Sequence, residues 1–480
     1  MSAKQKYNTL WKTAKRDQHK ADLSHVDNIV IHASSASLES FSEPLQHAQP
    51  IEGPQSQSEC DVEMQGAHAN SDSDSDDADL DDRPSLGVRL AQWANEFQVK
   101  HNAVDGLLKI LGEHHSELPR TARTLLETCE NVNLEMKSGM QYFYFGCKEQ
   151  LCRHLNMYPG DVVSQLDCLD ISLNIDGLPL FKSSSQSLWP VLCKINLAPS
   201  TVFPLALCFG VSKPTDLDFF VVQDLRDILL NGLQTDRGHL GVRLRCISCD
   251  APAKALVKCT KQYSGYFGCD KCTQKGFWDG RRVIYPEMKN VTLRTDASFR
   301  EQLQEKHHQS FGVSPFCMLP IDMIQQFPAD YMHQCCLGVM QKLIVLWLCG
   351  KLSTRLSSGQ VREISSRLLG LRPFMPDLFA RKPRGLEDID RWKATELRQF
   401  VLYTGKIVLK GVLSDELYEH FMLFSVPTSS ETRTAESCFG DEFLVYNVHS
   451  MVHLASDAHA YCGLDECSSF PFENYLHQLK

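Results

Sequence analysis

The sequence predicts an α/β protein, and three observations carry that prediction. From Leu169 to Asp176, apolar and polar residues alternate strictly (LDISLNID), which is the pattern of a β-strand lying on a core. Residues 188–195 and 203–211 are short apolar runs that predict two further strands. Apolar residues then recur at helical spacing between 217 and 229, and another strand is predicted at 239–249.

Composition and the apolar runs exclude several classes of protein. The chain has 19 cysteines, but its polar, basic N-terminus is no signal peptide, so free thiols in a reducing compartment fit better than a disulfide framework. The longest apolar run, 343–349, is far too short to span a bilayer. We therefore expect a soluble intracellular protein without a membrane partner.

The N-terminal stretch differs from the rest of the chain. It carries most of the formal net charge of −10, begins basic and ends in the acidic run SDSDSDDADLDD at 71–82. Because it has few aromatic residues, we expect residues 1–84 to be a disordered tail. Residues 85–165 predict a small helical segment. A helical hairpin is favoured there over a DNA-reading helix-turn-helix, because Asp105 and Glu113 would face the phosphates.

Residues 166–279 predict the first part of a ribonuclease-H-like core, because the order is three strands, helix, strand, helix. The first and fourth strands of such a core are neighbours, so Asp176 and Asp250 should lie side by side. Two adjacent carboxylates repel unless a cation lies between them, and Mg²⁺ prefers such oxygen ligands. Taken singly, each aspartate also fits an ordinary turn or helix cap.

Cysteines and histidines form a second constellation. Cys269 and Cys272 have the spacing of half a zinc site, and His449 and His453 share one face of a predicted helix. We predict one tetrahedral zinc site from these four residues. Closing a long loop is entropically costly, and four strong ligand bonds would hold its two ends together. The alternative is a four-cysteine ribbon in which Cys246 and Cys249 replace the histidines. It is less attractive because neighbouring cysteines of an extended strand face opposite sides.

Several motifs, in the same order, resemble the animal branch of the CACTA-type (En/Spm-like) DNA transposases. They are DGLPLFKSSSQSLWPVL, CDAPAKALVKC, YSGYFGCDKC, DYMHQCCLGVMQKL, WKATELRQFVLYTG, VYNVHSMVHL and FPFENYLHQLK, and they cover roughly residues 85–480. The family is related to the recombinase core of antigen-receptor gene assembly. The resemblance implies a catalytic triad of Asp176, Asp250 and Glu473 that binds two Mg²⁺ ions. It also implies a helical insertion at 280–445, and an end of the core at 446–480 that holds the zinc histidines and the third acid.

The implied function is Mg²⁺-dependent phosphodiester hydrolysis and strand transfer at transposon ends. DNA would be the partner, a homodimer the active form and the nucleus the location. Family members continue beyond the glutamate helix, so this copy is expected to be truncated and its activity is open. The alternative is a domesticated, transposase-derived protein that binds DNA or protein without catalysis. Asp330 and His333 match a further family motif, and we interpret them as a buried hydrogen-bonded pair that orients the insertion.

Overall fold

The computed structural model describes residues 85–97, 99–127, 134–137, 139–180, 185–211, 213–214, 222–286, 291–310, 312–425 and 437–479. The tail predicted at 1–84 lies outside these residues. The chain divides into two compact units, Met1–Trp93 and Ala94–Lys480. Apart from the first turns of α2 (Leu86–Glu96), the described residues belong to the second unit.

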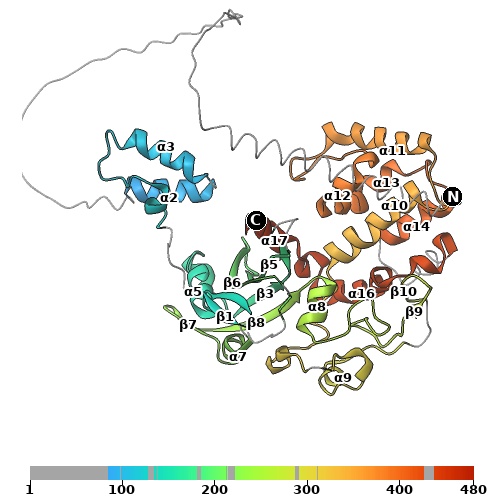
Figure 1. Cartoon of the computed structure of the whole chain (residues 1–480), viewed down its shortest axis with the longest axis horizontal. Coiled ribbons are helices and arrows are strands. Elements are labelled where there is room, and N and C mark those ends of the chain that lie inside the picture. Colours follow the sequence, from blue (N-terminus) through green and yellow to red (C-terminus); the bar gives the residue numbers. More distant parts are fainter. Residues whose placement is uncertain are drawn as a thin grey trace, which may run out of the picture. The chain divides into compact units, whose positions relative to one another are not determined.

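A mixed sheet of eight strands organises the second unit (Figure 1). Its order is β1-β2-β6-β5-β3-β8-β7, and β4 pairs with β5 off this path. The strands are Glu135–Lys137 (β1), Met140–Tyr144 (β2), Cys168–Ile175 (β3), Leu178–Pro179 (β4), Ser187–Ile195 (β5), Thr201–Gly210 (β6), Leu233–Thr235 (β7) and Gly238–Ser248 (β8). The four strands predicted from the sequence are β3, β5, β6 and β8. The predicted crossover helix is α7, described over Val222–Asn231.

Strands β3 and β8 are direct neighbours. They run parallel, from Cys168 opposite Gly241 to Asn174 opposite Ser248, while β3 pairs antiparallel with β5 and β5 with β6. Asp176 follows β3 directly, and Asp250 comes two residues after β8. Because the two strands are parallel, both aspartates lie at the same edge of the sheet. The prediction that these strands are adjacent in one mixed sheet is therefore confirmed.

Both faces of the sheet are covered. On one face, α5 (Cys147–Leu155) and α7 pack their apolar residues against β3 and β8 in the larger of the cores. On the other face the polar side chains of β3 are buried too, with Ser172 and Asn174 each 1% exposed. Asn174 donates from Nδ2 to the carbonyl of Ser248 at 3.0 Å, which offsets part of the cost of its burial. Helix α17 (Phe470–Leu479) covers this face, packing Phe472 on Leu192 of β5.

Short helices precede and follow the sheet strands. Helices α2 and α3 confirm that the chain is helical where the two helices of the hairpin are expected. The α-helices not yet given are His101–Leu111 (α3), Ala122–Leu125 (α4), Gly160–Ser164 (α6), Ala251–Val257 (α8), Asp296–Arg300 (α9), Gln341–Cys349 (α10), Ser358–Leu371 (α11), Ala394–Gln399 (α12), Gly405–Val408 (α13), Asp415–Ser425 (α14) and Tyr446–Tyr461 (α16).

Several single turns and two wider helices complete the second unit. The stretches Met332–Met340 (η3) and Phe400–Thr404 (η6) are π-helical. The 3₁₀ turns are Glu305–His307 (η1), Pro315–Met318 (η2), Arg372–Phe374 (η4), Leu386–Arg391 (η5), Asp441–Phe443 (η7) and Leu464–Cys467 (η8). A small hairpin of Phe277–Trp278 (β9) and Val283–Ile284 (β10) forms a separate two-stranded sheet.

The region after the sheet is largely helical and has its own core. Trp347, Phe400 and Phe421 lie at its centre, and each is at most 1% exposed. By length and composition, the helical stretch Met332–Cys349 could cross a membrane. Half of that stretch is buried, and Leu343 and Trp347 are fully enclosed by the other helices, as in the core helix of a globular domain.

Candidate functional site

Three polar side chains meet beside the edge at which β3 ends. Asp176 comes from the turn after β3, His333 from the start of η3 and Glu473 from the first turn of α17. One ligand atom of each lies within 4.8 Å of the others, and His333 Nε2 is 3.9 Å from Glu473 Oε1. These residues are separated by well over a hundred positions in the chain, so the fold itself assembles the group. Two of the three predicted acids are therefore together.

Asp250, the remaining acid, stands at the end of the neighbouring strand. It is the N-cap of α8, and its Oδ1 accepts a hydrogen bond from the Ala253 amide at 2.7 Å. It is not one of the three residues whose ligand atoms gather within 4.8 Å. Its charge nevertheless acts on Asp176 and His333, which places it within electrostatic reach of both. Asp250 therefore has the helix-capping role that the sequence analysis gave as its alternative, and it also lies near the acidic group.

The electrostatics of this edge favour a proton or a cation. Burial and the charge of Asp250 raise the pKa of the Asp176 carboxyl to about 7, with Glu473 adding to the rise and His333 opposing it. A carboxyl with such a pKa repels further negative charge and gains from a bound cation. A perturbed acid at the end of a sheet strand is the kind of group that functional sites contain.

The Asp330–His333 pair does more than orient the helical region. Asp330 is fully buried, and its Oδ2 lies 2.5 Å from His333 Nδ1. Burial alone would lower the pKa of His333, but the bond to Asp330 and the nearby acids raise it to about 9. The other oxygen of Asp330 accepts the Ser469 amide at 3.0 Å, just before α17. Asp330 therefore holds both His333 and the helix that carries Glu473.

The sequence interpretation missed His333 as a member of the acidic group. Its spacing from Asp330 indicated a hydrogen-bonded pair, which the structure confirms. The available signal was the charged Asp-x-x-His pair at the start of an otherwise apolar helix. A polar pair in that setting needs either a buried partner or a function.

The predicted cysteines and histidines converge on one point. Cys269 Sγ lies 3.5 Å from His453 Nε2, Cys272 Sγ lies 3.3 Å from His449 Nε2, and the two sulfurs are 3.5 Å apart. The edges of a tetrahedral zinc site measure roughly 3.3–3.8 Å, given bonds of about 2.3 Å to sulfur and 2.0–2.1 Å to nitrogen. All four side chains are buried. This group could hold a structural metal such as zinc.

The protonation of Cys269 and the packing of His449 also suit metal binding. Burial acts to raise the pKa of the Cys269 thiol, but the hydrogen bond from Cys272 and the His449 charge outweigh it and hold that pKa well below its usual range. The same hydrogen bond raises the pKa of Cys272, so the pair shares one thiolate. A thiolate is the form that binds metal. The His449 ring stacks on Tyr285 with 4.8 Å between centroids, which fixes its orientation. The sulfur–sulfur distance of 3.5 Å is far longer than the ~2.05 Å of a disulfide.

The four-cysteine alternative is wrong. Cys246 packs with Tyr461 and Cys467, and its thiol donates to Ser172 Oγ at 3.4 Å. Cys249 lies in the apolar core on the other side of the sheet. The strand geometry of β8 separates the two thiols, as alternation along a strand requires.

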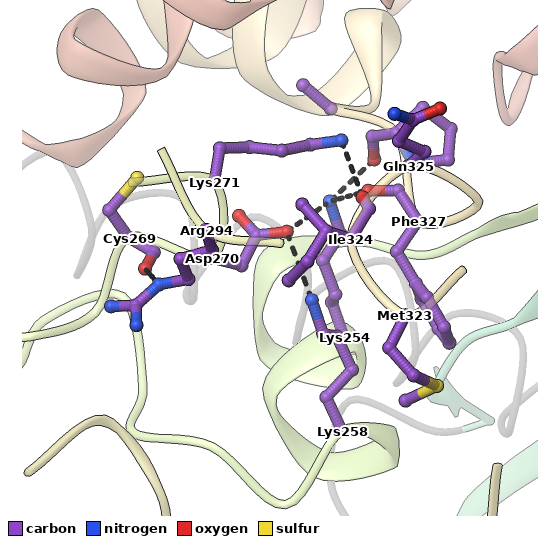
Figure 2. A network of polar contacts seen from close by, with 12 residues as sticks. Lys254, Lys258, Cys269, Asp270, Lys271, Arg294, Met323, Ile324, Gln325 and Phe327 are labelled. Carbon is purple, nitrogen blue, oxygen red and sulfur yellow. Dashed lines mark hydrogen bonds and ion pairs between the residues drawn. The ribbon is translucent and has the colours of Figure 1, made fainter. Parts of the chain in front are cut away.

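The cysteine–histidine group of Cys269, Cys272, His449 and His453 is called the metal group below. A buried charge network joins it to the sheet edge at which Asp176 lies. Figure 2 shows Lys254 of α8 and Lys258, the residue after that helix, reaching Asp270 with Nζ–Oδ2 distances of 3.4 and 3.8 Å. Asp270 lies between Cys269 and Cys272 in the chain. Lys271 pairs with Asp457 of α16 at 3.1 Å. Lys254 also donates to the carbonyl of Pro328, two residues before Asp330. Helix α8, the cysteine pair and the segment leading to His333 are thus held together.

In the motif WKATELRQF, Glu396 has a structural role. It is 4% exposed, accepts two hydrogen bonds from Arg384 at 2.7 and 2.6 Å, and caps α12 through the Lys393 amide at 2.9 Å. Arg398 pairs with Asp465. These contacts stabilise the helical core.

Comparison with known proteins adds no family to this geometry. No model of a known protein family matches the chain, and no curated protein matches it in a sequence search.

Proposed function

We propose that this protein is a transposase-like enzyme that hydrolyses phosphodiester bonds of DNA and transfers strands at transposon ends, using Mg²⁺. The observation that carries the proposal is the meeting of Asp176, Glu473 and His333 beside Asp250. Two carboxylates that meet beside a third, at one edge of a sheet, supply oxygen ligands of the kind used in metal-dependent phosphoryl transfer.

The fold supports the same proposal. The strand order β6-β5-β3-β8, with β3 antiparallel to β5 and parallel to β8, is the order of a ribonuclease-H-like core. The resemblance of the sequence motifs to CACTA-type transposases points to this chemistry and to a homodimer acting on DNA in the nucleus. The cysteine–histidine group would hold the zinc ion that the resemblance implies.

Each side chain has a defined part in the proposal. Asp176 and Glu473 offer carboxylate oxygens, the donors that Mg²⁺ prefers, and Asp250 adds charge from the neighbouring strand. Bound Mg²⁺ would activate a water or a 3′-hydroxyl and stabilise the leaving oxygen. His333, held by Asp330, places its Nε2 3.9 Å from Glu473 Oε1, so a protonated His333 would attract that carboxylate.

One observation favours the second candidate, a transposase-derived protein that binds DNA or protein without cutting. The Oδ1 of Asp250 is already occupied by the N-terminus of α8. If that cap cannot be shared with a metal, the triad is incomplete and the fold serves binding alone.

Nicking of supercoiled plasmid DNA separates the two candidates. We expect nicks with Mg²⁺ or Mn²⁺, none with EDTA, and losses of at least about a hundredfold in D176N and E473Q. Asp170→Asn is the matched control, because Asp170 lies on the same strand but pairs with Arg243 at 2.7 Å, away from the acidic group. Purified protein that never nicks, or D176N that nicks like the native chain, would contradict the catalytic proposal.

A further inference from the structure

The segment that carries the metal cysteines also exposes a group of aromatic rings. Between 261 and 286, all of which the structure describes, Tyr263, Tyr266, Phe277 and Trp278 are 42, 48, 45 and 58% exposed. Exposing aromatic rings to water is unfavourable, and a group of them on one short segment indicates a binding surface. Phe277 and Trp278 form strand β9, so their rings lie on opposite faces of the hairpin, and the four-residue turn 279–282 leads back into β10.

Exposed cations accompany these rings. Lys261, Lys275, Arg281 and Arg282 are all exposed, and Lys275 Nζ lies 5.9 Å from the centre of the Tyr266 ring. The single exposed acid of this described stretch, Asp279, is occupied by the turn itself. Its Oδ1 accepts the amides of Arg281 and Arg282 at 2.7 and 2.8 Å. The four aromatic and four basic side chains together are called the hairpin surface below.

The hairpin surface is rigidly mounted. The amide of Gly276 donates to the carbonyl of Tyr266 at 2.7 Å, which joins the hairpin to the loop before Cys269. Tyr285, just after β10, donates its hydroxyl to the carbonyl of Gly265 at 2.9 Å. Tyr285 also stacks on His449 of the metal group. The rings therefore stand on a fixed base and do not need to be ordered when a ligand binds, which lowers the entropic cost of binding.

We propose that the hairpin surface binds an unpaired nucleic-acid strand, with the rings stacking on bases and the cations contacting phosphates. Aromatic platforms interleaved with basic side chains are how single strands are recognised without a fixed sequence. An acidic protein partner would form ion pairs with the cations, but it would not supply planar groups on which the four aromatic rings could stack. The nucleic acid is DNA if the proposed function holds, and the surface would then receive a strand separated near the cleaved end.

Fluorescence anisotropy of labelled 20-nucleotide strands tests the proposal. The D176N protein without added Mg²⁺ is used, so that binding is measured apart from cleavage. We expect tighter binding to single-stranded than to duplex DNA of equal length, with an RNA strand as a further arm. Phe277→Ala and Trp278→Ala should each weaken binding by about 5- to 100-fold, the range of one lost base stack. In R281A/R282A, the slope of log K against log salt should fall by roughly 1.4.

Two matched controls keep the test specific. Phe374→Ala removes an 81% exposed ring from η4, and Arg362→Ala removes an exposed cation from α11, so neither should change the affinity. Zinc content and circular dichroism verify that each variant is folded. Single-strand binding that survives F277A/W278A unchanged, or a preference for duplex DNA, would overturn the proposal. Single-strand binding that depends on Phe277 and Trp278, by a protein that never nicks DNA, would uphold this inference while the catalytic proposal fails.

Discussion

His420 is a buried histidine, and protonation of its ring is expected to destabilise the folded protein. It is 0% exposed, faces the rings of Phe439 and Phe443, and neither ring nitrogen has a hydrogen-bond partner among the described residues. Burial lowers the pKa of His420 to about 4. The unfolded chain, with a pKa near 6.5, therefore binds the proton first as the pH falls. The stability that neutral His420 gives is complete above about pH 6.5 and is lost between 6.5 and 4.

We predict that H420L removes this pH dependence. The native protein should lose up to about 3 kcal/mol of unfolding free energy between pH 6.5 and 4 through this residue, and the variant should not. Urea titrations at several pH values measure the difference. At pH 8 the histidine is neutral in both states, so the comparison there reports packing alone. Parallel curves for both proteins down to pH 4 would show that His420 is not buried as described.

Asp270 is the anion on which the buried lysines depend. It is 6% exposed, and Lys254 and Lys258, at 2% and 0%, approach its Oδ2. The pKa of the Asp270 carboxyl is lowered well below its usual range, because the three nearby lysines outweigh the effect of burial. Burial and the charges of the neighbouring cations lower the pKa of Lys258 to about 7, although the charge of Asp270 opposes the shift.

Removing this anion should be costly. We predict that D270N lowers the unfolding free energy by roughly 3–5 kcal/mol, the cost of leaving a buried cation unpaired. Chemical denaturation at pH 7 measures it. Asp377→Asn, at an exposed pair with Lys382, should change stability by less than about 0.5 kcal/mol. A D270N protein as stable as this control would mean that the network is not held by charge.

At the scale of elements, the metal group joins two segments that lie far apart in the chain. Cys269 and Cys272 sit in the loop after α8, whereas His449 and His453 lie on α16, more than 170 positions later. A bound ion would hold the loop that carries the hairpin surface against α16, and metal binding would then contribute to folding free energy.

We predict one zinc ion per chain, lost in C272S and in H453A. Both variants should melt well below the native protein, because the ends of a long loop are released. Elemental analysis and thermal unfolding are the measurements. Cys349→Ser, at the exposed end of α10, is the matched control and should keep its zinc. Native protein purified without bound metal, and insensitive to added zinc, would contradict the prediction.

The elements that the sequence predicts correctly share one property, which is that their signal is local. Alternation marks β3, and the Cys-x-x-Cys and His-x-x-x-His spacings mark the metal group. Burial of Ser172 and Asn174 was not predictable, because the helix that covers them lies almost 300 residues later. The β9–β10 hairpin was predictable, since Asp279-Gly280 between two apolar pairs is a hairpin signal. The place of His333 beside Glu473 depends on tertiary packing alone.

At the scale of the whole molecule, the sheet and the later, largely helical chain each contribute residues to one acidic site. The sheet supplies Asp176 and Asp250, and the later chain supplies His333 and Glu473. Connection rules allow the adjacency of β3 and β8 to be derived from strand order. No such rule places α17 on the sheet face. Before the structure, the only ground for placing Glu473 near the two aspartates was therefore the resemblance to the transposase family.

The most direct test is Mn²⁺ binding, followed by electron paramagnetic resonance on protein whose zinc site is filled. Mn²⁺ takes the same oxygen ligands as Mg²⁺ and reports each ion that binds. We expect saturable binding by the native chain, weakened at least tenfold in D176N and in E473Q and unchanged in D170N. Equal binding by all four proteins, or none by the native chain, would contradict a metal site at this edge of the sheet.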